Sequence, residues 1–526
     1  MTAQQRWLLR GGTVHDGLGA PGRPAGVLVE DGRISAVGAQ LDAAGATEVD
    51  CSDLIVCPGF IDTHSHSDAL PLLEDAQPFK LLQGVTTEIA GNCGMSMAPL
   101  TADAAAEFVG LYGELAPGVE IGPGSFADFA ARIEQSGPTN NIALLVGHST
   151  LRLSANGMST ALRPGALDTM RTMAAESFEA GACGLSTGLI YVPGTYSDTD
   201  EVVALAEVAA AYGALYTTHM RDEGIHVEAA LDEALEIGRR AGVRVQISHC
   251  KAAGRQMHGR GELVLERIAR GRREGIDVLG DQYPYTAGAT VLSSLIPSRA
   301  MAGGVEALRE RLGDSVERAE LRAEAERQGD GSGLWHDLEP KDVLITEHRY
   351  SAVVGRTLAE LSAGADPWDT LCDLVLADTG AMIVLQLMAE IDVRRIMSDP
   401  LIAVGSDNGP PIGLQHPRTW GCFPRLLGTY VREEGVLTWE EALRKATSMP
   451  ARHFGLHGRG VLRAGAVADI CVFNPRTVGY AGTYQDPAVQ PSGIEWVFLA
   501  GHAVVREGAF QGERRGALLR HGRRGD

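Results

Sequence analysis

The stretch P-G-F-I-D-T-H-S-H-S-D, residues 58 to 68, decides how the rest of the chain is interpreted. Phe60 and Ile61 favour a β-strand, and a Pro-Gly pair precedes them as a breaker. Residues two apart on a strand point to the same face, so we expect His64 and His66 to project together from the strand's carboxyl end. Two neutral imidazoles on one face form half of a metal site, although an isolated His-x-His pair is also compatible with a structural role.

Composition narrows the possible functions. The chain has 526 residues, and its 46 basic and 67 acidic side chains give a net charge of −21 at pH 7. This charge disfavours nucleic acids and anionic membranes as partners. The N-terminus lacks the apolar run of a signal peptide, and no later stretch has the length of a membrane span. We therefore expect a cytoplasmic protein, and the sequence leaves its oligomeric state open.

The order of apolar and amphipathic stretches predicts the fold class, which is α/β. Short apolar runs alternate with longer amphipathic ones such as residues 167–180 and 227–241, the pattern of repeated βα units around a parallel sheet. Eight such units predict a (β/α)8 barrel, whose active site lies at the carboxyl ends of the strands. The predicted strands are residues 60–63, 85–90, 142–146, 183–186, 215–218, 243–248, 276–280 and 401–406.

Segments outside the barrel predict two further parts. Residues 1–57 and 460–526 are rich in short β-like runs, including a hairpin signal around Asp31-Gly32, and should form one small β domain from both termini. The catalytic barrel would then span residues 58–459. Residues 290–350 are too long for one crossover and predict an inserted subdomain over the barrel mouth. The basic tail after Arg514 is interpreted as a solvated or docked end.

Potential metal ligands follow five of the predicted strands. Each of them alone has an ordinary structural explanation, since most histidines and buried cysteines are not ligands. Together they lie at the end of the barrel that such enzymes use for chemistry, and this joint placement indicates a metal site. The residues are His64 and His66 after the first strand, Cys93 after the second, His219 after the fifth, His249 after the sixth and Asp407 after the eighth.

At this point the sequence resembles the amidohydrolase superfamily and, within it, the N-acyl-D-amino-acid deacylases, or D-aminoacylases. The resemblance runs from the early hairpin nearly to the C-terminus. The motifs that carry it are P-G-F-I-D-T-H-S-H at 58–66, G-V-T-T-E-I-A-G-N-C-G at 84–94, G-L-S-T-G-L-I-Y at 184–191, T-H-M-R-D-E-G at 218–224, I-S-H-C-K at 247–251, D-Q-Y-P-Y at 281–285, G-S-D at 405–407 and H-P-R-T-W-G at 416–421.

The resemblance implies how the ligands are divided. Many two-metal amidohydrolases bridge their metals with a carboxylated lysine after strand four, but the four lysines of this chain, at 80, 251, 341 and 445, all lie elsewhere. The D-aminoacylase pattern implies that Cys93 takes this place. By resemblance, Cys93, His219 and His249 would hold one tightly bound Zn²⁺. His64, His66 and Asp407, sharing Cys93, would form a second, weaker site, and the sequence leaves open whether it is occupied.

The same resemblance implies hydrolysis of the amide bond of an N-acyl-D-amino acid by metal-activated water. Asp407 is placed to accept a proton as general base and to return it to the departing nitrogen. The substrate's free carboxylate calls for fixed cations or donors, and Arg418 and Lys251 suit this role. Tyr191 and Tyr283 follow the fourth and seventh strands and are further candidates for substrate binding. The preference for the D-isomer rests on the resemblance alone.

Three positions qualify this interpretation. Asn408 stands where the family usually has Gly after Ser-Asp, and Cys250 follows His249; neither change removes a ligand. His148, just past the third strand, is a candidate for contact with ligands or substrate, although a structural role is favoured. The alternatives are another amidohydrolase activity (cyclic amide hydrolase, dipeptidase or deaminase) or a non-catalytic scaffold. Pseudoenzymes of this kind typically lose ligands, whereas this chain keeps all six.

Overall fold

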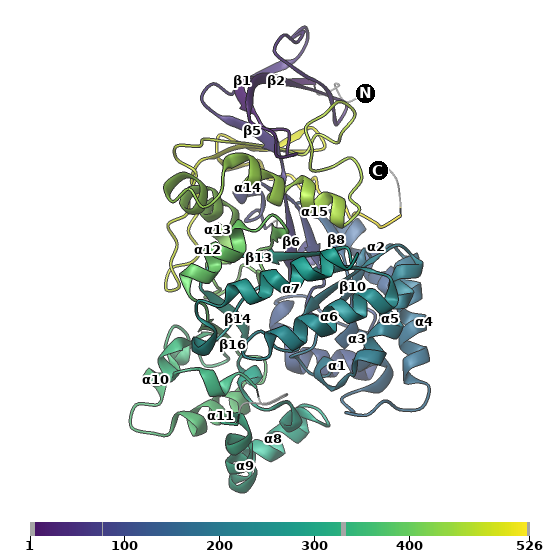
Figure 1. The fold of residues 1–526 in the computed structure, drawn as a ribbon, viewed down its shortest axis with the longest axis vertical. Coiled ribbons are helices and arrows are strands. Elements are labelled where there is room, and N and C mark those ends of the chain that lie inside the picture. The colour runs from purple at the N-terminus through teal and green to yellow at the C-terminus, as the bar shows by residue number, and fades with distance from the viewer. Residues whose placement is uncertain (1–5, 76, 328–332, 523–526) are drawn as a thin grey trace.

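The structure, a computed structural model, describes residues 6–75, 77–327 and 333–522. Parallel strands lie at its centre (Figure 1), and their pairing forms a ring. Pairing runs β6-β7-β8 and β9-β10-β11-β12-β13-β17, and β8 continues into β9 across Leu145, whose amide donates to the Ala90 carbonyl at 2.8 Å. The strands are β6 Phe60–Ser65, β7 Val85–Ala90, β8 Asn141–Leu144, β9 Val146–Gly147, β10 Gly184–Gly188, β11 Leu215–His219, β12 Arg244–Ile247, β13 Val278–Gln282 and β17 Ile402–Val404.

The ring closes between its last strand and its first. Ser65 pairs with Asn408 in a parallel bridge, and the Asp407 amide donates to the His64 carbonyl at 2.8 Å. With β8 and β9 counted as one interrupted strand, this confirms the predicted barrel. The closure also lies beside the metal-ligand candidates, so the bonds that complete the barrel position them.

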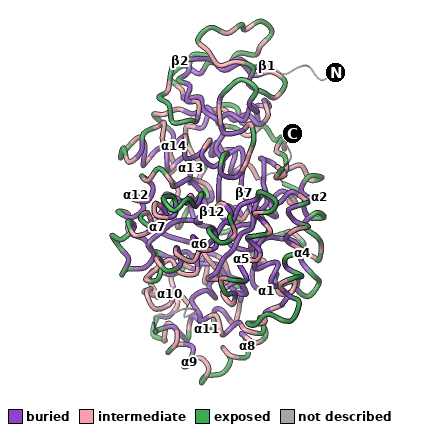
Figure 2. Tube along the Cα trace, turned by 45° about the vertical axis from the view of Figure 1, so that its right-hand side comes forward, coloured by how far each residue is buried: buried purple, intermediate pink, exposed green. Residues whose placement is uncertain are grey.

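Helices cover the outside of the barrel because one face of each is apolar. In α6 the buried residues include Val227, Leu231, Ala234 and Leu235, which recur at the three- and four-residue spacing of one helix face. Figure 2 shows the buried chain concentrated in the middle of the molecule and the exposed chain along its outer loops. The helices are α1 Ala102–Tyr112, α2 Phe126–Ser136, α3 His148–Asn156, α4 Ala166–Glu179, α5 Thr199–Ala211, α6 Val227–Ala241, α7 Gly261–Arg273, α12 Glu390–Ser398, α13 Arg418–Arg425, α14 Trp439–Ala446 and α15 Ser448–His453.

Both ends of the chain build one sheet, at the top of Figure 1. Strand β5 pairs in parallel with β1 and antiparallel with β18, and so joins the N-terminal strands to the C-terminal ones. Strands from both terminal segments thus belong to one sheet. Its strands are β1 Arg6–Val14, β2 Arg23–Glu30, β3 Arg33–Gly38, β4 Thr47–Asp50, β5 Ile55–Pro58, β18 Ile470–Phe473, β19 Ile494–Leu499, β20 His502–Arg506 and β21 Ala509–Phe510.

An insertion between β13 and β17 lies at the opposite end of the molecule (Figure 1). It is longer than the expected residues 290–350, because its three-stranded sheet places β16 between β14 and β15 and therefore needs chain as far as Gln386. Its Trp368 belongs to the same apolar cluster as Val146 and Leu231 of the barrel unit, so the insertion packs on the barrel. Its elements are β14 Ala287–Val291, α8 Val305–Gly313, α9 Ser315–Ala325, β15 Val343–Glu347, α10 Leu358–Leu361, α11 Pro367–Ala377 and β16 Met382–Gln386.

The basic C-terminal segment is docked on the barrel. Arg514 donates hydrogen bonds to the carbonyls of Pro71 and Glu74, and Leu518 pairs with Ile142 beside β8. Arg514 thus satisfies carbonyls of the chain's own backbone. Within the described ranges, no helix is both long and apolar enough to cross a membrane.

Candidate metal centre

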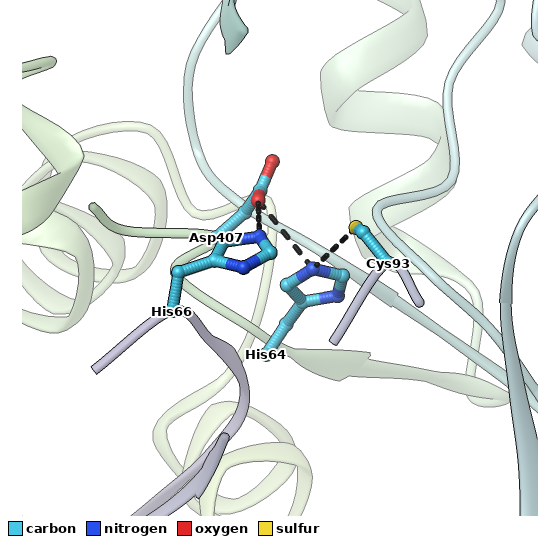
Figure 3. A group of neighbouring side chains, drawn as sticks. All are labelled: His64, His66, Cys93 and Asp407. Carbon is cyan, nitrogen blue, oxygen red and sulfur yellow. Dashed lines mark hydrogen bonds and ion pairs between the residues drawn. The ribbon is translucent and has the colours of Figure 1, made fainter. Parts of the chain in front are cut away.

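The six ligand candidates meet at the carboxyl end of the barrel. Cys93 lies between His219 and His249 on one side and His64, His66 and Asp407 on the other. The Cys93 Sγ lies 3.3 Å from His64 Nε2, 3.8 Å from His219 Nδ1 and 3.6 Å from His249 Nε2. On the other side, Asp407 Oδ1 lies 3.4 Å from the Nε2 atoms of both His64 and His66. Figure 3 shows the His64 ring between Cys93 and Asp407, with the His66 ring turned toward the same carboxylate.

The donor atoms form two overlapping sets, each of a size and type that holds a metal ion. One set is Cys93, His219 and His249, and the other adds His64, His66 and Asp407 to the same Cys93; within each set all donor atoms lie within 4.8 Å of one another. Nitrogen, thiolate and carboxylate donors are the ligands that zinc prefers. The structure thus brings together all six residues expected from the sequence, in the division that the resemblance implied.

Carboxylates lie close to the second ring nitrogen of three of the histidines. His249 Nδ1 lies 2.9 Å and His219 Nε2 3.5 Å from Glu223, and His64 Nδ1 lies 3.7 Å from Asp281. Metal-bound histidines usually direct the second ring nitrogen to a carboxylate or carbonyl, which leaves the first nitrogen free for the metal. The arrangement at His249, whose Nδ1 lies at hydrogen-bond distance from Glu223, therefore fits a zinc ligand.

Electrostatics favour the same conclusion. Burial lowers the pKa of His219 to about 3 and holds that of His64 well below its usual value, so both rings are neutral, the form that binds metal. Burial, reinforced by Asp407 and Glu223, raises the pKa of the Cys93 thiol. Its thiolate therefore needs a neighbouring cation. A metal ion supplies one, since coordination deprotonates a thiol.

The backbone carries strain where three of the candidates stand. Cys93, His249 and Asp407 have φ angles of 54°, 35° and 51°, in the left-handed region that side chains other than glycine's rarely adopt. Each such residue costs on the order of 1–3 kcal/mol and persists where the surrounding structure enforces it. The strand ends turn sharply at these points, and the turns aim the three side chains at one place.

Two carboxylates at the site were not singled out from the sequence. Glu223 contacts Lys251 Nζ at 2.6 Å in addition to the two histidines. Burial would raise the pKa of Glu223, but His219, Lys251 and His249 outweigh it and lower the pKa, so the group is a carboxylate. Asp281 accepts the His249 backbone amide at 2.7 Å. The sequence signal that could have identified Glu223 is its position four residues after the ligand candidate His219 in T-H-M-R-D-E-G.

The expected substrate-binding residues line one small cavity beside the ligands. Arg418 donates from Nη2 to Asp407 Oδ2 at 2.9 Å, while its Nε and Nη1 are buried without a hydrogen-bond partner among the described residues. The Tyr283 ring lies near two cations, with its centroid 4.4 Å from the Arg418 guanidinium and 5.9 Å from Lys251 Nζ. Tyr191 instead hydrogen-bonds Thr290 of the insertion at 3.0 Å. This cavity has a volume of about 80 Å³.

Asn408 and His148 make contacts that stabilise the fold. The Asn408 amide oxygen accepts hydrogen bonds from the buried Lys80 at 2.8 Å and from Ser406 at 2.9 Å, so this side chain anchors the turn after Asp407. His148 is buried and contacts Glu201 at 2.8 Å. Neither residue lines the cavity beside the ligands.

Comparison with known proteins agrees with the geometry. A family model described as "Amidohydrolase family" matches residues 357–505. The chain is 36% identical over 515 residues to the D-aminoacylase of Alcaligenes xylosoxydans xylosoxydans, with 97% of each chain covered. It is 38% identical over 525 residues to the N-acyl-D-glutamate deacylase of the same organism, covering 98% of this chain and 96% of that protein.

Among solved structures, the fold is similar to that of the N-acyl-D-glutamate deacylase from Bordetella bronchiseptica, which was crystallised with zinc and a phosphonate inhibitor. The TM-score is 0.82 at 34% identity, and the match covers 98% of this chain and 99% of the other. Identity at this level over nearly the whole length, together with the shared fold, places the chain in a family. It belongs to the N-acyl-D-amino-acid deacylase, or D-aminoacylase, family of the amidohydrolase superfamily.

Proposed function

We propose that this protein is a zinc-dependent hydrolase that splits the amide bond of N-acyl-D-amino acids into a carboxylic acid and a free D-amino acid. The observation that carries the proposal is the position of Cys93 between His64, His219 and His249. The names of the relatives, D-aminoacylase and N-acyl-D-glutamate deacylase, support the reaction and the stereochemistry.

Cys93, His219 and His249 would hold the tightly bound zinc, and His64, His66 and Asp407 would complete a second, weaker site. When bound, zinc lowers the pKa of a water molecule and polarises a carbonyl oxygen, the two requirements of amide hydrolysis. The residues of the chain supply the remaining functions, which are proton transfer and substrate binding.

Asp407 is proposed as the general base and then acid. Burial would raise its pKa, but Arg418 and then His64 outweigh burial and hold the pKa well below its usual value. Asp407 is thus a carboxylate at neutral pH and can accept a proton from the attacking water. It would then return that proton to the departing nitrogen, which leaves poorly unless it is protonated.

Arg418, Lys251 and Tyr283 are proposed to bind the carboxylate of the substrate. Two donors of Arg418, Nε and Nη1, have no hydrogen-bond partner among the described residues, so the guanidinium can donate to a substrate carboxylate as well as to Asp407. Lys251 Nζ donates a hydrogen bond to Glu223 and lies 5.9 Å from the Tyr283 ring centroid, so it adds positive charge from a fixed position. Tyr191, whose ring centroid lies 4.8 Å from that of His219, would contact the substrate near the reacting carbonyl.

The experiment compares hydrolysis of N-acetyl-D-methionine, its L-isomer and a cyclic imide, with the Asp407→Asn variant beside the parent. We expect release of D-methionine only, and a nearly complete loss in the variant. Equal rates on both enantiomers would refute the D-specific proposal, and faster cleavage of the imide would favour a cyclic amidase. Zinc content below one ion per chain, unchanged by added metal, would favour a non-catalytic scaffold.

We also propose a cytoplasmic location. All eight cysteines are free and buried, which is typical of proteins in reducing compartments.

A further inference from the structure

A second, larger cavity opens beside the small one. Its volume is about 490 Å³, within the range of sites that enclose whole small molecules. Ile190, Tyr191, Val291 and Leu387 line both cavities, so the two are neighbours across a shared wall. The small cavity, at about 80 Å³, has room for only a few water-sized groups beside the ligands. A substrate with a bulky part must therefore extend beyond it.

The arrangement of charges decides which part of the substrate extends. Lys251, Tyr283 and Arg418 line the small cavity and not the large one, so a carboxylate held by them lies away from the shared wall. The reacting carbonyl must lie at Cys93 and the histidines. In an N-acyl amino acid the acyl chain leaves the carbonyl on the side away from the amino-acid carboxylate. That side faces Tyr191 and the large cavity.

The lining of the large cavity suits a neutral chain. Ile225 and Ile296 add apolar surface to the shared wall. Arg221, a basic residue in this lining, donates two hydrogen bonds to the Glu233 carboxylate, each 2.9 Å long, and another to the Ser197 carbonyl. The other carboxylates and imidazoles in the lining are those of Asp198, Asp222, Glu223, His226, His336 and Asp337. This acidic surplus disfavours an acyl group that carries its own carboxylate.

We propose that the large cavity binds the acyl chain of the substrate, and that the enzyme prefers neutral acyl groups longer than acetyl over both acetyl and acidic ones. This inference rests on the proposed deacylase function and specifies its substrate class. Neither the identity to the relatives nor the ligand set indicates an acyl preference; the cavity and its charges carry it.

The first test measures kcat/KM for release of D-methionine from its N-acetyl, N-butanoyl, N-hexanoyl and N-succinyl derivatives. Each buried methylene group contributes about fourfold at most, so we expect hexanoyl to exceed acetyl by about tenfold or more. Butanoyl and succinyl have the same number of carbon atoms and differ in one carboxylate, and we expect butanoyl to exceed succinyl by about tenfold, the factor for roughly 1.4 kcal/mol.

The second test fills the cavity with Ile225→Trp, because Ile225 is half-buried and lines the large cavity only. We expect the ratio of hexanoyl to acetyl kcat/KM to fall about tenfold, with the zinc content equal to that of the parent. Ile391→Trp, at an exposed isoleucine of α12, is the matched control and should leave the ratio unchanged.

Hydrolysis of the acetyl compound with falling rates on longer chains would overturn the inference and leave deacylation intact. An unchanged ratio in Ile225→Trp would also overturn it. No release of D-methionine from any derivative would overturn both the inference and the proposed function.

Discussion

Glu223→Gln tests whether the metal centre depends on its outer contacts. The substitution keeps the shape of the side chain and removes its charge from the contacts with His249 at 2.9 Å, His219 at 3.5 Å and Lys251 at 2.6 Å. A hydrogen bond to a charged group contributes about 1.5–3 kcal/mol, and each 1.4 kcal/mol is a factor of about ten. We therefore expect zinc to bind about 10- to 100-fold more weakly, the usual range for such contacts.

The assay is competition for zinc between the purified protein and a chelator of known affinity, with kcat/KM measured on the same samples. Glu236→Gln is the matched control, because Glu236 lies on α6 in an exposed pair with Arg239. We expect the control to bind zinc like the parent. Unchanged zinc affinity in Glu223→Gln would refute the argument that the Glu223 carboxylate orients His219 and His249 toward the metal.

Three further predictions concern substrate binding and stability. Arg418→Lys replaces the planar guanidinium by an ammonium group, and we expect KM for an N-acyl-D-amino acid to rise about tenfold or more while KM for its carboxamide stays the same. An equal rise in KM for both substrates would contradict the proposed role of Arg418. Gly188→Ala would place a Cβ atom 2.2 Å from the Cys93 carbonyl oxygen, so we expect a loss of about 1–3 kcal/mol in urea unfolding together with weaker zinc retention. Lys80→Met leaves the buried Asp62 carboxylate without its cation, so we expect the free energy of unfolding to fall by about 3–5 kcal/mol in the same assay. A fall of less than about 1 kcal/mol would show that the ion pair between Lys80 and Asp62 is not required for stability.

The barrel was predictable because its strands are short, apolar and separated by helices of regular period. Residues 85–90 form a strand with the expected bounds, and the helix expected at 227–241 begins and ends as predicted. The insertion was harder to delimit. Its sheet places β16 between β14 and β15, and this order of pairing leaves no local signal in the chain.

The sequence by itself determined which side chains stand at the ends of the strands, since the period of a strand and the direction of a parallel barrel bring His64, His219 and Asp407 to the same rim. Only the tertiary structure decided how they meet. The left-handed turns at Cys93, His249 and Asp407, the carboxylate of Glu223 behind two of the histidines, and the large cavity beyond Tyr191 all arise from segments far apart in the chain. Such features depend on packing that forces the backbone into costly conformations, and packing cannot be deduced from local pattern.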